Sequence, residues 1–248
     1  MQPNLTQNLK KWNSIERYSR WIFSKFKTYA GKRILDIGAG IGSITQYFVD
    51  DAEFVLATDI FENQLSIITE RFRGCNIKTL LLNIETDDIK KLKQYNFDTI
   101  VCINVLEHLE NDLNALLKMK DIVASGGRII IMVPAGSKLF NNMDKSAGHH
   151  RRYDKEDLKR LAEKAELKII YHSYFNMFGI LPYYLKGRTL AGENGAITYS
   201  STLNNINSKF YNFATVLLEP VERIFNVPFG LSEIVVLEQN RRTSCDED

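Results

Sequence analysis

The alternation of short apolar runs with amphipathic stretches is the feature of this sequence that most constrains its fold. From residue 33 to residue 134, apolar runs of strand length alternate with segments of helical spacing. Such alternation builds βαβ units, which produce a parallel sheet covered by helices on both faces. The predicted strands are RILDI, EFVLATDI, NIKTLLL, FDTIVCINV and RIIIMVP, and the predicted helices are ITQYFVDD, FENQLSIITERF and LENDLNALLKMKDIVAS. The sequence therefore predicts an α/β, doubly wound, Rossmann-like fold.

The rest of the chain completes this sheet and adds helical segments to it. A polar loop, AGSKLFNNMDKSAGHHRRY, precedes the helix KEDLKRLAEKAE, for which Asp154 and Asp157 predict a capping box. LKIIYHSYF and SEIVVLEQ predict a sixth and a seventh strand. We expect a single domain over residues 1–248 with a seven-stranded, mostly parallel sheet. Its predicted parts are an N-terminal helical segment (1–30), a core (31–175), a helical, aromatic insertion (176–231) and the last strand (232–240).

The composition argues against several classes of protein. A formal net charge of +2 over 248 residues provides no field that would attract a nucleic acid. The cysteines, Cys75, Cys102 and Cys245, form neither a CxxC motif nor a Cys/His spacing, so no metal site is predicted and a reducing setting fits best. The longest apolar stretch, from Ile129 to Ala135, is far too short to cross a bilayer. We expect a cytoplasmic protein that binds no nucleic acid.

The stretch ILDIGAGIGS, from Ile34 to Ser43, joins a strand to glycines at alternate positions. A strand that ends in Gly-x-Gly and enters a helix brings backbone N–H groups close to a ligand. A dinucleotide-binding loop would require a third glycine at position 43, where this chain has Ser43. Asp36 would also repel a pyrophosphate but attract a cation. These residues argue against an NAD-dependent oxidoreductase, the alternative class, and favour S-adenosyl-L-methionine, which carries a sulfonium and an ammonium.

The motif DIGAGIG resembles the glycine motif of the class I S-adenosylmethionine-dependent methyltransferases, and the resemblance runs from Lys32 to Pro134. It implies S-adenosyl-L-methionine as cofactor. Asp59 would accept hydrogen bonds from the ribose hydroxyls, and the segment NVLEHLEND would line the methionine end. Asn83 departs from the family pattern, which often has an aspartate near the adenine. The implied cofactor-binding residues are Asp36, Gly38, Gly40, Asp59, Ile60, Asn83, Ile84, Asn104, Val105 and His108.

Several of these residues also have a structural interpretation. Asp59 could cap the helix that begins in FENQL, and Asp36 could be a structural carboxylate. Glu107 and His108 could form no more than a solvated turn and the start of a helix. The joint order of the glycine loop, the ribose acid and the LEHLE segment indicates a cofactor site more strongly than any single part.

The loop after the fifth strand is the predicted acceptor site, because ligands of open α/β sheets lie at the carboxyl ends of the strands. Its GHHRRYD sequence resembles a Gly-His-x-Arg-Arg-Tyr segment in a subgroup of bacterial methyltransferases linked to glycan, lipid or natural-product pathways. His149 is the predicted catalytic residue, since a hydroxyl acceptor needs a base with a pKa near neutrality. Arg151, Arg152 and Tyr153 are predicted to bind substrate, the arginines as a fork for a carboxylate or phosphate.

The arginines of this loop have an alternative interpretation, in which they pair with Asp144, Asp154 or Asp157 and hold the loop in place. His150 is expected to be solvated. The choice between the two interpretations depends on which carboxylates the folded chain brings near the guanidinium groups.

Two aromatic segments lie outside the predicted sheet. The helix before the first strand, with Trp12, Tyr18 and Trp21, resembles the N-terminal lid of the family, and Tyr18 is predicted to contact substrate. Packing on the sheet would require the same side chains. The insertion, with FNMFGILPYYLKGRTL, predicts an apolar wall for a lipophilic substrate, a homodimer face or a membrane-surface contact.

We predict methyl transfer to a small or lipid-linked molecule, with a hydroxyl, carboxylate or phosphoryl-type oxygen as the nucleophile. A nitrogen of a small molecule or protein is the alternative acceptor. Methylation of adenine nitrogen in nucleic acids is disfavoured, because NVLEH stands where an Asn/Asp-Pro-Pro-Tyr type motif would be required.

Overall fold

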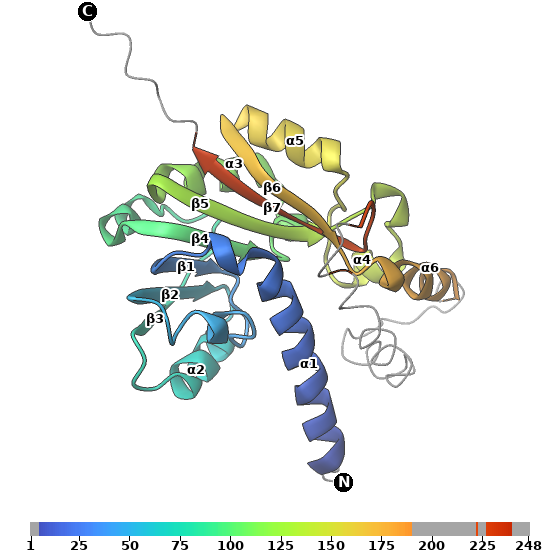
Figure 1. Ribbon diagram of the computed structural model, residues 1–248, viewed down its shortest axis with the longest axis horizontal. Helices are drawn as coiled ribbons and strands as arrows, with labels where there is room; N and C mark the ends of the chain where they lie inside the picture. Colours follow the sequence, from blue (N-terminus) through green and yellow to red (C-terminus); the bar gives the residue numbers. More distant parts are fainter. Residues whose placement is uncertain (1–4, 190–221, 223–226, 240–248) are drawn as a thin grey trace, which may run out of the picture.

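The computed structural model describes residues 5–189, Glu222 and residues 227–239, and it shows one sheet with helices on both faces (Figure 1). The strands are β1 (Arg33–Ile37), β2 (Phe54–Asp59), β3 (Ile77–Leu81), β4 (Phe97–Ile103), β5 (Val123–Pro134), β6 (Leu167–Phe175) and β7 (Ser232–Gln239). The helices are α1 (Leu5–Phe26), α2 (Glu62–Arg71), α3 (Asp112–Ile122), α4 (Asn142–Ser146), α5 (Lys155–Lys164) and α6 (Ile180–Thr189). The predicted seven-stranded α/β fold is confirmed.

The strand order across the sheet is β3-β2-β1-β4-β5-β7-β6. The first five strands in this order pair in parallel, whereas β7 runs antiparallel to both β5 and β6. The chain steps from β1 outward to β3 and then returns to place β4 on the other side of β1. This reversal makes the β1/β4 junction the switch point at which open α/β sheets bind ligands.

The core has two layers because successive strand residues face opposite sides of the sheet. One layer packs under α3 and α5 and includes Leu35, Ile100, Ile129, Val235, Leu116, Met119 and Leu158. The other layer packs against the C-terminal part of α1 and includes Ile34, Val101, Ile130, Val236, Trp21, Ile22 and Phe26. Leu65 and Ile68 of α2 cover Ala57 of β2 in a smaller cluster. The helices α2 and α3 thus bury their apolar sides against the parallel strands.

The helix predicted at ITQYFVDD is wrong. The structure has turns and a single 3₁₀ segment, Thr45–Tyr47, between β1 and β2. Ile44, Thr45 and Val49 are β-branched and have low helix propensity. Asp50 and Asp51 would also place negative charge at the C-terminal end of a helix, which its dipole disfavours. The Thr45 hydroxyl is used instead to donate a hydrogen bond to Asp36.

Two further boundaries differ from the sequence prediction. α3 ends at Ile122 and β5 begins at Val123, so the predicted helical end IVAS belongs largely to the strand. The β-branched Val123 takes an extended conformation, with φ −70° and ψ 140°. The loop after β5 also contains the short α4, which begins at a capping box between Asn141 and Asp144. The capping box predicted for Asp154 and Asp157 is confirmed at the start of α5.

Most of the predicted insertion lies outside the described residues. Of residues 176–231, the structure describes 176–189, including α6, together with Glu222 and 227–231. The side chain of Trp12 and the predicted last residue of the final strand, Asn240, also lie outside. Within the described part of the chain, no helix is both long enough and apolar enough to span a membrane.

Candidate active site

The predicted cofactor residues lie at or just after the carboxyl ends of β1, β2, β3 and β4, and the predicted acceptor loop follows β5 (Figure 1). Because these strands are parallel, their following segments meet at one edge of the sheet. The fold thus brings residues from Asp36 to Tyr153 to the same side of the molecule. This edge is the candidate active site.

The glycine loop after β1 is shaped by its φ angles and by Val105. Gly38 has a φ of +71°, and a Cβ there would lie 2.3 Å from Cγ2 of Val105. Gly40 has a φ of +57°, and among the described residues a Cβ there would meet only Oε1 of Gln64, at 3.4 Å. The first glycine therefore allows the β4 segment to pack on the loop. The second leaves the outer side of the loop open to a ligand.

Asp36 is a buried carboxylate at the end of β1. It is 2% exposed, and Oγ1 of Thr45 donates a 2.7 Å hydrogen bond to its Oδ2. Burial raises the pKa of Asp36 to about 6, against the opposing effect of the Thr45 hydrogen bond. A buried negative charge beside the loop suits a cationic ligand better than a pyrophosphate.

Asp59 links the ends of β1 and β2. Its Oδ2 accepts a 2.9 Å hydrogen bond from the N–H of Gly40, and its Oδ1 accepts one of 3.0 Å from the N–H of Phe61. Each oxygen keeps a second lone pair, so the carboxylate can still accept from hydroxyl groups of a ligand. Asp59 is not the helix cap that we had considered, because the N-cap of α2 is Phe61. Ile60, the next residue, is 57% exposed.

The residues after β3 are held by a local turn. Oδ1 of Asn83 accepts from the N–H of Glu85 at 2.9 Å, and the N–H of Asn83 donates to Asp87. Ile84 is buried in the main core. Of these two predicted adenine neighbours, Asn83 is the one that is partly accessible.

The NVLEH segment after β4 forms a tight turn at the switch point. Asn104 has a φ of +55°, and its N–H donates to the carbonyl of Met132 on β5 at 2.8 Å. Glu107 is 1% exposed, so the interpretation of this residue as part of a solvated turn is wrong. Burial raises the pKa of Glu107 to about 8. His108, in contrast, is exposed, and burial of part of its ring lowers its pKa.

His149 belongs to a hydrogen-bonded group centred on Asp144. Nδ1 of His149 and Nε of Arg152 both bond to Oδ1 of Asp144, at 3.0 and 2.8 Å, while Oδ2 accepts from the N–H of Asn141. Burial opposes ionisation of Asp144, but the hydrogen bond from His149 and the charge of Arg152 outweigh it and lower its pKa. The rings of His149 and His108 meet edge to face, with centroids 4.7 Å apart. The acceptor loop thus contacts the β4 segment.

The other arginine and the tyrosine of the loop meet Asp112 at the start of α3. Nη1 of Arg151 lies 2.9 Å from Oδ2 of Asp112, and the hydroxyl of Tyr153 donates to the same carboxylate at 2.9 Å. Tyr153 is buried, and the side chain of Arg152 is 3% exposed, whereas that of Arg151 is 33% exposed. The interpretation in which the arginines pair with carboxylates fits this geometry. Asp144 is one of the partners that it named, whereas Asp112 is not.

Tyr18 lies near the C-terminal end of α1, where the helix packs on the sheet. Its ring contacts Trp21 and Phe175 edge to face, with centroids 6.3 and 5.3 Å apart. Figure 1 shows the N-terminal half of α1 extending away from the strands. Tyr18 is partly buried, so its side chain can both pack on the sheet and contact a ligand.

Sequence reasoning missed Thr45, Asp112 and the central position of Asp144. Thr45 bonds to Asp36 across the turns that follow the glycine loop. Asp112 and Asp144 come from separate elements and meet the GHHRRY loop only in the folded chain. An Asn-x-x-Asp capping box at Asn141 was the one local signal that could have marked Asp144.

Comparison with known proteins identifies the class. Residues 14–172 match the family model described as "Methyltransferase domain", which covers more than half of the chain. The chain belongs to this family, and it is an S-adenosyl-L-methionine-dependent methyltransferase.

Particular relatives are distant. The chain is 24% identical over 102 residues to the ubiquinone biosynthesis O-methyltransferase of Dechloromonas aromatica (strain RCB), which covers 41% of this chain and 44% of that protein. It is 22% identical over 162 residues to the protein of the same name from Aeromonas salmonicida (strain A449), covering 60% and 68%. The match thus spans less than half the length of the first relative.

A solved structure shares the fold. Magnesium protoporphyrin IX methyltransferase of Synechocystis PCC 6803, with bound S-adenosylhomocysteine, aligns with a TM-score of 0.54 at 12% identity over 97% of this chain and 90% of that chain. The cofactor of this chain is S-adenosyl-L-methionine. The buried Asp36, the open side of Gly40 and the free lone pairs of Asp59 fit a cationic nucleoside.

Proposed function

We propose that this methyltransferase transfers the methyl group to an oxygen atom of a small or lipid-linked molecule. The observation that carries the proposal is the hydrogen bond from His149 to the buried Asp144 beside the NVLEH segment. Proteins named O-methyltransferase among the relatives support an oxygen acceptor. A soluble, cytoplasmic setting accords with the composition and remains part of the same proposal.

The cofactor residues along the sheet edge are proposed to contact different parts of the cofactor. Asp36 supplies negative charge near the methionine end, Asp59 accepts from the ribose hydroxyls, and Ile60 offers an exposed apolar surface to the adenine. Gly38, Gly40, Asn104 and Val105 form the wall between these groups. Asn83 and Ile84 complete the adenine side, the first by contact and the second by support from the core. The cofactor supplies an electrophilic methyl group on a sulfonium.

His149 is proposed to activate the acceptor. Asp144 accepts from Nδ1, which fixes the ring and leaves the Nε2 lone pair free. Gly38 packs against Val105, which lies in the same turn as His108. The ring of His108 in turn contacts the ring of His149, so a continuous set of contacts joins the glycine loop to His149. Methyl transfer to a hydroxyl requires loss of its proton, and we assign Nε2 of His149 as the base that removes it.

Arg151 is the proposed contact for an anionic group of the substrate, because its side chain is partly exposed. Arg152 and Tyr153 are proposed to hold the acceptor loop in place rather than to touch the substrate, since their polar atoms already bind Asp144 and Asp112. Tyr18 is proposed to approach the substrate from α1. A carboxylate or phosphate on the acceptor would meet Arg151 without displacing the buried ion pair of Arg152.

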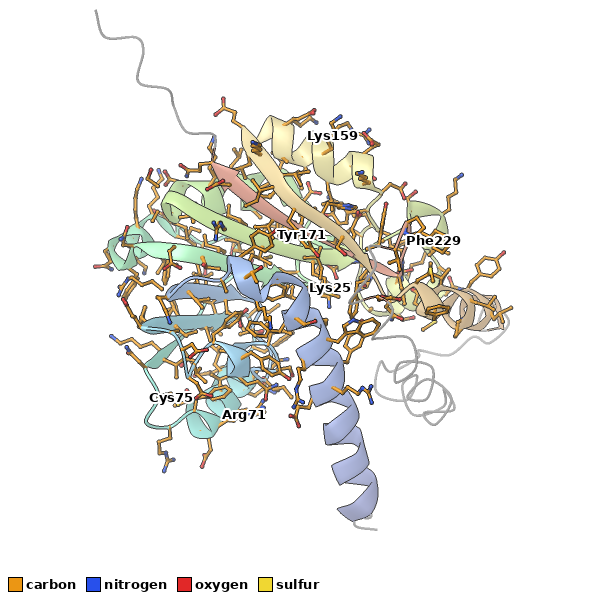
Figure 2. All side chains as sticks on the ribbon, viewed as in Figure 1. Lys25, Arg71, Cys75, Lys159, Tyr171 and Phe229 are labelled. Atoms are coloured by element: carbon orange, nitrogen blue, oxygen red, sulfur yellow. The ribbon has the colours of Figure 1, made fainter. Side chains whose placement is uncertain are left out.

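The apolar surface of α6 supports a lipophilic acceptor and contact with a membrane surface. Cζ of Arg152 lies 4.2 Å from the ring centroid of Tyr183, so α6 adjoins the acceptor loop. Phe229 lies on the same side of the molecule as α6 (Figure 2). The exposed apolar side chains here are Phe178, Leu181, Tyr184, Leu185 and Phe229. A homodimer face is the competing use of this surface.

A thermal-shift titration tests the cofactor side of the proposal. S-adenosylhomocysteine should raise the melting temperature, whereas NAD should leave it unchanged, because only a ligand of the native state stabilises it. Asp36→Ala should remove the response to S-adenosylhomocysteine. Stabilisation by NAD alone would contradict the proposal.

A second assay tests the acceptor. Release of S-adenosylhomocysteine should require an added acceptor with a hydroxyl, carboxylate or phosphoryl oxygen, and His149→Ala should lower it for hydroxyl acceptors. Turnover with amine acceptors alone would show nitrogen methylation instead.

A further inference from the structure

Three side chains beside the proposed cofactor site form a cluster that methyl transfer alone does not require. One donor atom each from Glu107, His108 and His149 lies within 4.8 Å of the other two. Glu107 and His108 follow β4, and His149 follows β5, so the switch point of the sheet brings them together. Two imidazoles and a carboxylate are a common ligand set for divalent metal ions in catalytic sites.

The hydrogen bonds of both histidines leave the same nitrogen free. Nδ1 of His108 lies 3.2 Å from the carbonyl of Gly148, and a carbonyl can only accept, so this nitrogen carries the proton. Nδ1 of His149 bonds to the Asp144 carboxylate in the same way. The lone pair of each ring therefore resides on Nε2. Outer hydrogen bonds of this kind fix the tautomer of histidines that bind metals.

Glu107 provides the second, independent observation. The residue is 1% exposed, and its Oε2 has no hydrogen-bond partner among the residues that the structure describes. Burial of an unpaired carboxylate oxygen is costly, and native structures normally satisfy such atoms with a partner or an ion. A cation held by the two histidines would provide that partner.

We propose that Glu107, His108 and His149 bind a divalent first-row transition metal ion, such as Zn²⁺, Mn²⁺ or Co²⁺, which presents an open coordination position to a hydroxyl acceptor. Imidazole donors favour these ions over Mg²⁺ and Ca²⁺, which prefer all-oxygen sites. Asp144 and Gly148 are then positioning groups that hold the two rings. The inference rests on the proposed function and replaces one step of it: Nε2 of His149 binds the ion, and the ion rather than this nitrogen promotes loss of the hydroxyl proton.

The chemical step is balanced as follows. The acceptor hydroxyl binds the ion, which lowers its pKa, and its proton passes to solvent water. The oxygen forms a bond to the methyl carbon while the carbon–sulfur bond breaks, and the electron pair of that bond neutralises the sulfonium. The products are a methyl ether, S-adenosylhomocysteine and one proton. The preferred substrate class is therefore an alcohol or phenol rather than an amine.

Metal titration of the full chain, after removal of metals with a chelator, tests the site directly. Co²⁺ should bind once per chain with visible absorption bands of a nitrogen- and oxygen-bound ion, and Zn²⁺ should displace it. His108→Ala and Glu107→Gln should each weaken binding at least tenfold. His108 is exposed, so its variant should fold normally. His150→Ala is the matched control, because His150 is an exposed histidine outside the cluster.

The outcomes separate the metal site from the cofactor site. Absence of Co²⁺ and Mn²⁺ binding, or binding that His150→Ala weakens as much as His108→Ala, would overturn the metal site. If S-adenosylhomocysteine still stabilised the metal-free protein in that case, the proposed function would stand. Metal binding without any response to S-adenosylhomocysteine would leave the metal site and overturn the cofactor assignments.

Discussion

Gly38 is the residue at which backbone conformation and packing combine most tightly. Its φ is +71°, and a Cβ would lie 2.3 Å from Val105. We expect Gly38→Ala to lower the free energy of unfolding by roughly 2–4 kcal/mol. The alanine would have to adopt a left-handed backbone conformation, and its Cβ would overpack against Val105. Urea unfolding measures the change. Gly74→Ala is the control, because Gly74 has a φ of +90°, and no atom of the described part of the chain lies within 4 Å of its Cβ position. An equal effect in both variants would show that Val105 does not press on the loop.

Asp36 should make stability depend on pH in acid. Its pKa is raised from 3.8 to about 6 in the folded protein. The protonated Asp36 therefore makes its full contribution to the free energy of unfolding below pH 3.8, and this contribution is lost as the pH rises through 6. The loss amounts to about 3 kcal/mol. We expect Asp36→Asn to gain stability relative to the native chain between pH 4 and pH 6 and to hold that gain at pH 8. Its affinity for S-adenosylhomocysteine should nevertheless fall at least tenfold.

Urea unfolding at pH 4, 6 and 8, with titration of S-adenosylhomocysteine into both proteins, tests these two effects. Thr45 can still donate to Oδ1 of an asparagine, so the substitution keeps this hydrogen bond. A constant difference in stability across the pH range would contradict the burial of an ionised Asp36.

Residues with local signals could be predicted from the sequence, whereas partners across elements could not. Asp36, Gly38 and Asp59 were assigned to the candidate site because each lies at or just after the end of a predicted strand, and the structure places them there. The ion pair between Asp144 and Arg152 was only one of several pairings weighed, and Asp112 was not considered as a partner of Arg151. No local pattern tells which carboxylate a buried guanidinium will meet.

At the scale of elements, the C-terminal end of α1 should be structural. Phe26 is fully buried against the sheet, together with Trp21 and Ile22. We expect Phe26→Ala to lower the free energy of unfolding by about 3–5 kcal/mol, because it leaves a cavity in the core.

Tyr18→Phe should change stability little and should raise KM for the acceptor, because the proposed contact of the hydroxyl with substrate is removed. Urea unfolding and steady-state kinetics separate the two roles, and a large loss of stability in Tyr18→Phe with an unchanged KM would show that the hydroxyl is structural and does not meet substrate.

Strands were predicted more reliably than the elements between them. All seven apolar runs form strands, and burial on both faces explains the nearly continuous apolar patterns of β1, β2 and β4 at the centre of the sheet. The segment ITQYFVDD has apolar residues at helical spacing but forms turns, since Thr45 bonds back to Asp36. At this place beside the candidate site, a tertiary hydrogen bond thus determines the local structure and the helical periodicity of the sequence does not.

At the scale of the molecule, the apolar side of α6 should control attachment to lipid. Leu181 and Leu185 are 65% and 55% exposed on this helix. We expect the double variant Leu181→Ser with Leu185→Ser to sediment with phosphatidylcholine vesicles several-fold less than the native chain, because it removes apolar area from the contact. Ile67→Ser with Leu117→Ser is the control, since these exposed residues lie on α2 and α3. Equal loss in both variants would contradict a specific lipid face.

The overall architecture followed from the sequence because strand and helix periods are properties of the whole chain. The site combined residues from Asp36 to Tyr153, which only the parallel topology brings to one edge. The predicted absence of a metal site rested on local cysteine and histidine spacing. That criterion takes no account of Glu107, His108 and His149, the ligands of the proposed site, because they come together from separate loops.

The transfer of a labelled methyl group tests the central proposal most directly. S-adenosyl-L-methionine labelled at the methyl group should label small molecules or lipids of a cell extract, in a product whose methyl group is bound to oxygen. Asp36→Ala should lose this labelling, His149→Ala should lower the labelling of hydroxyl acceptors, and His150→Ala should keep it. Labelling confined to nitrogen or protein, or no acceptor-dependent transfer in any extract, would contradict the proposed function.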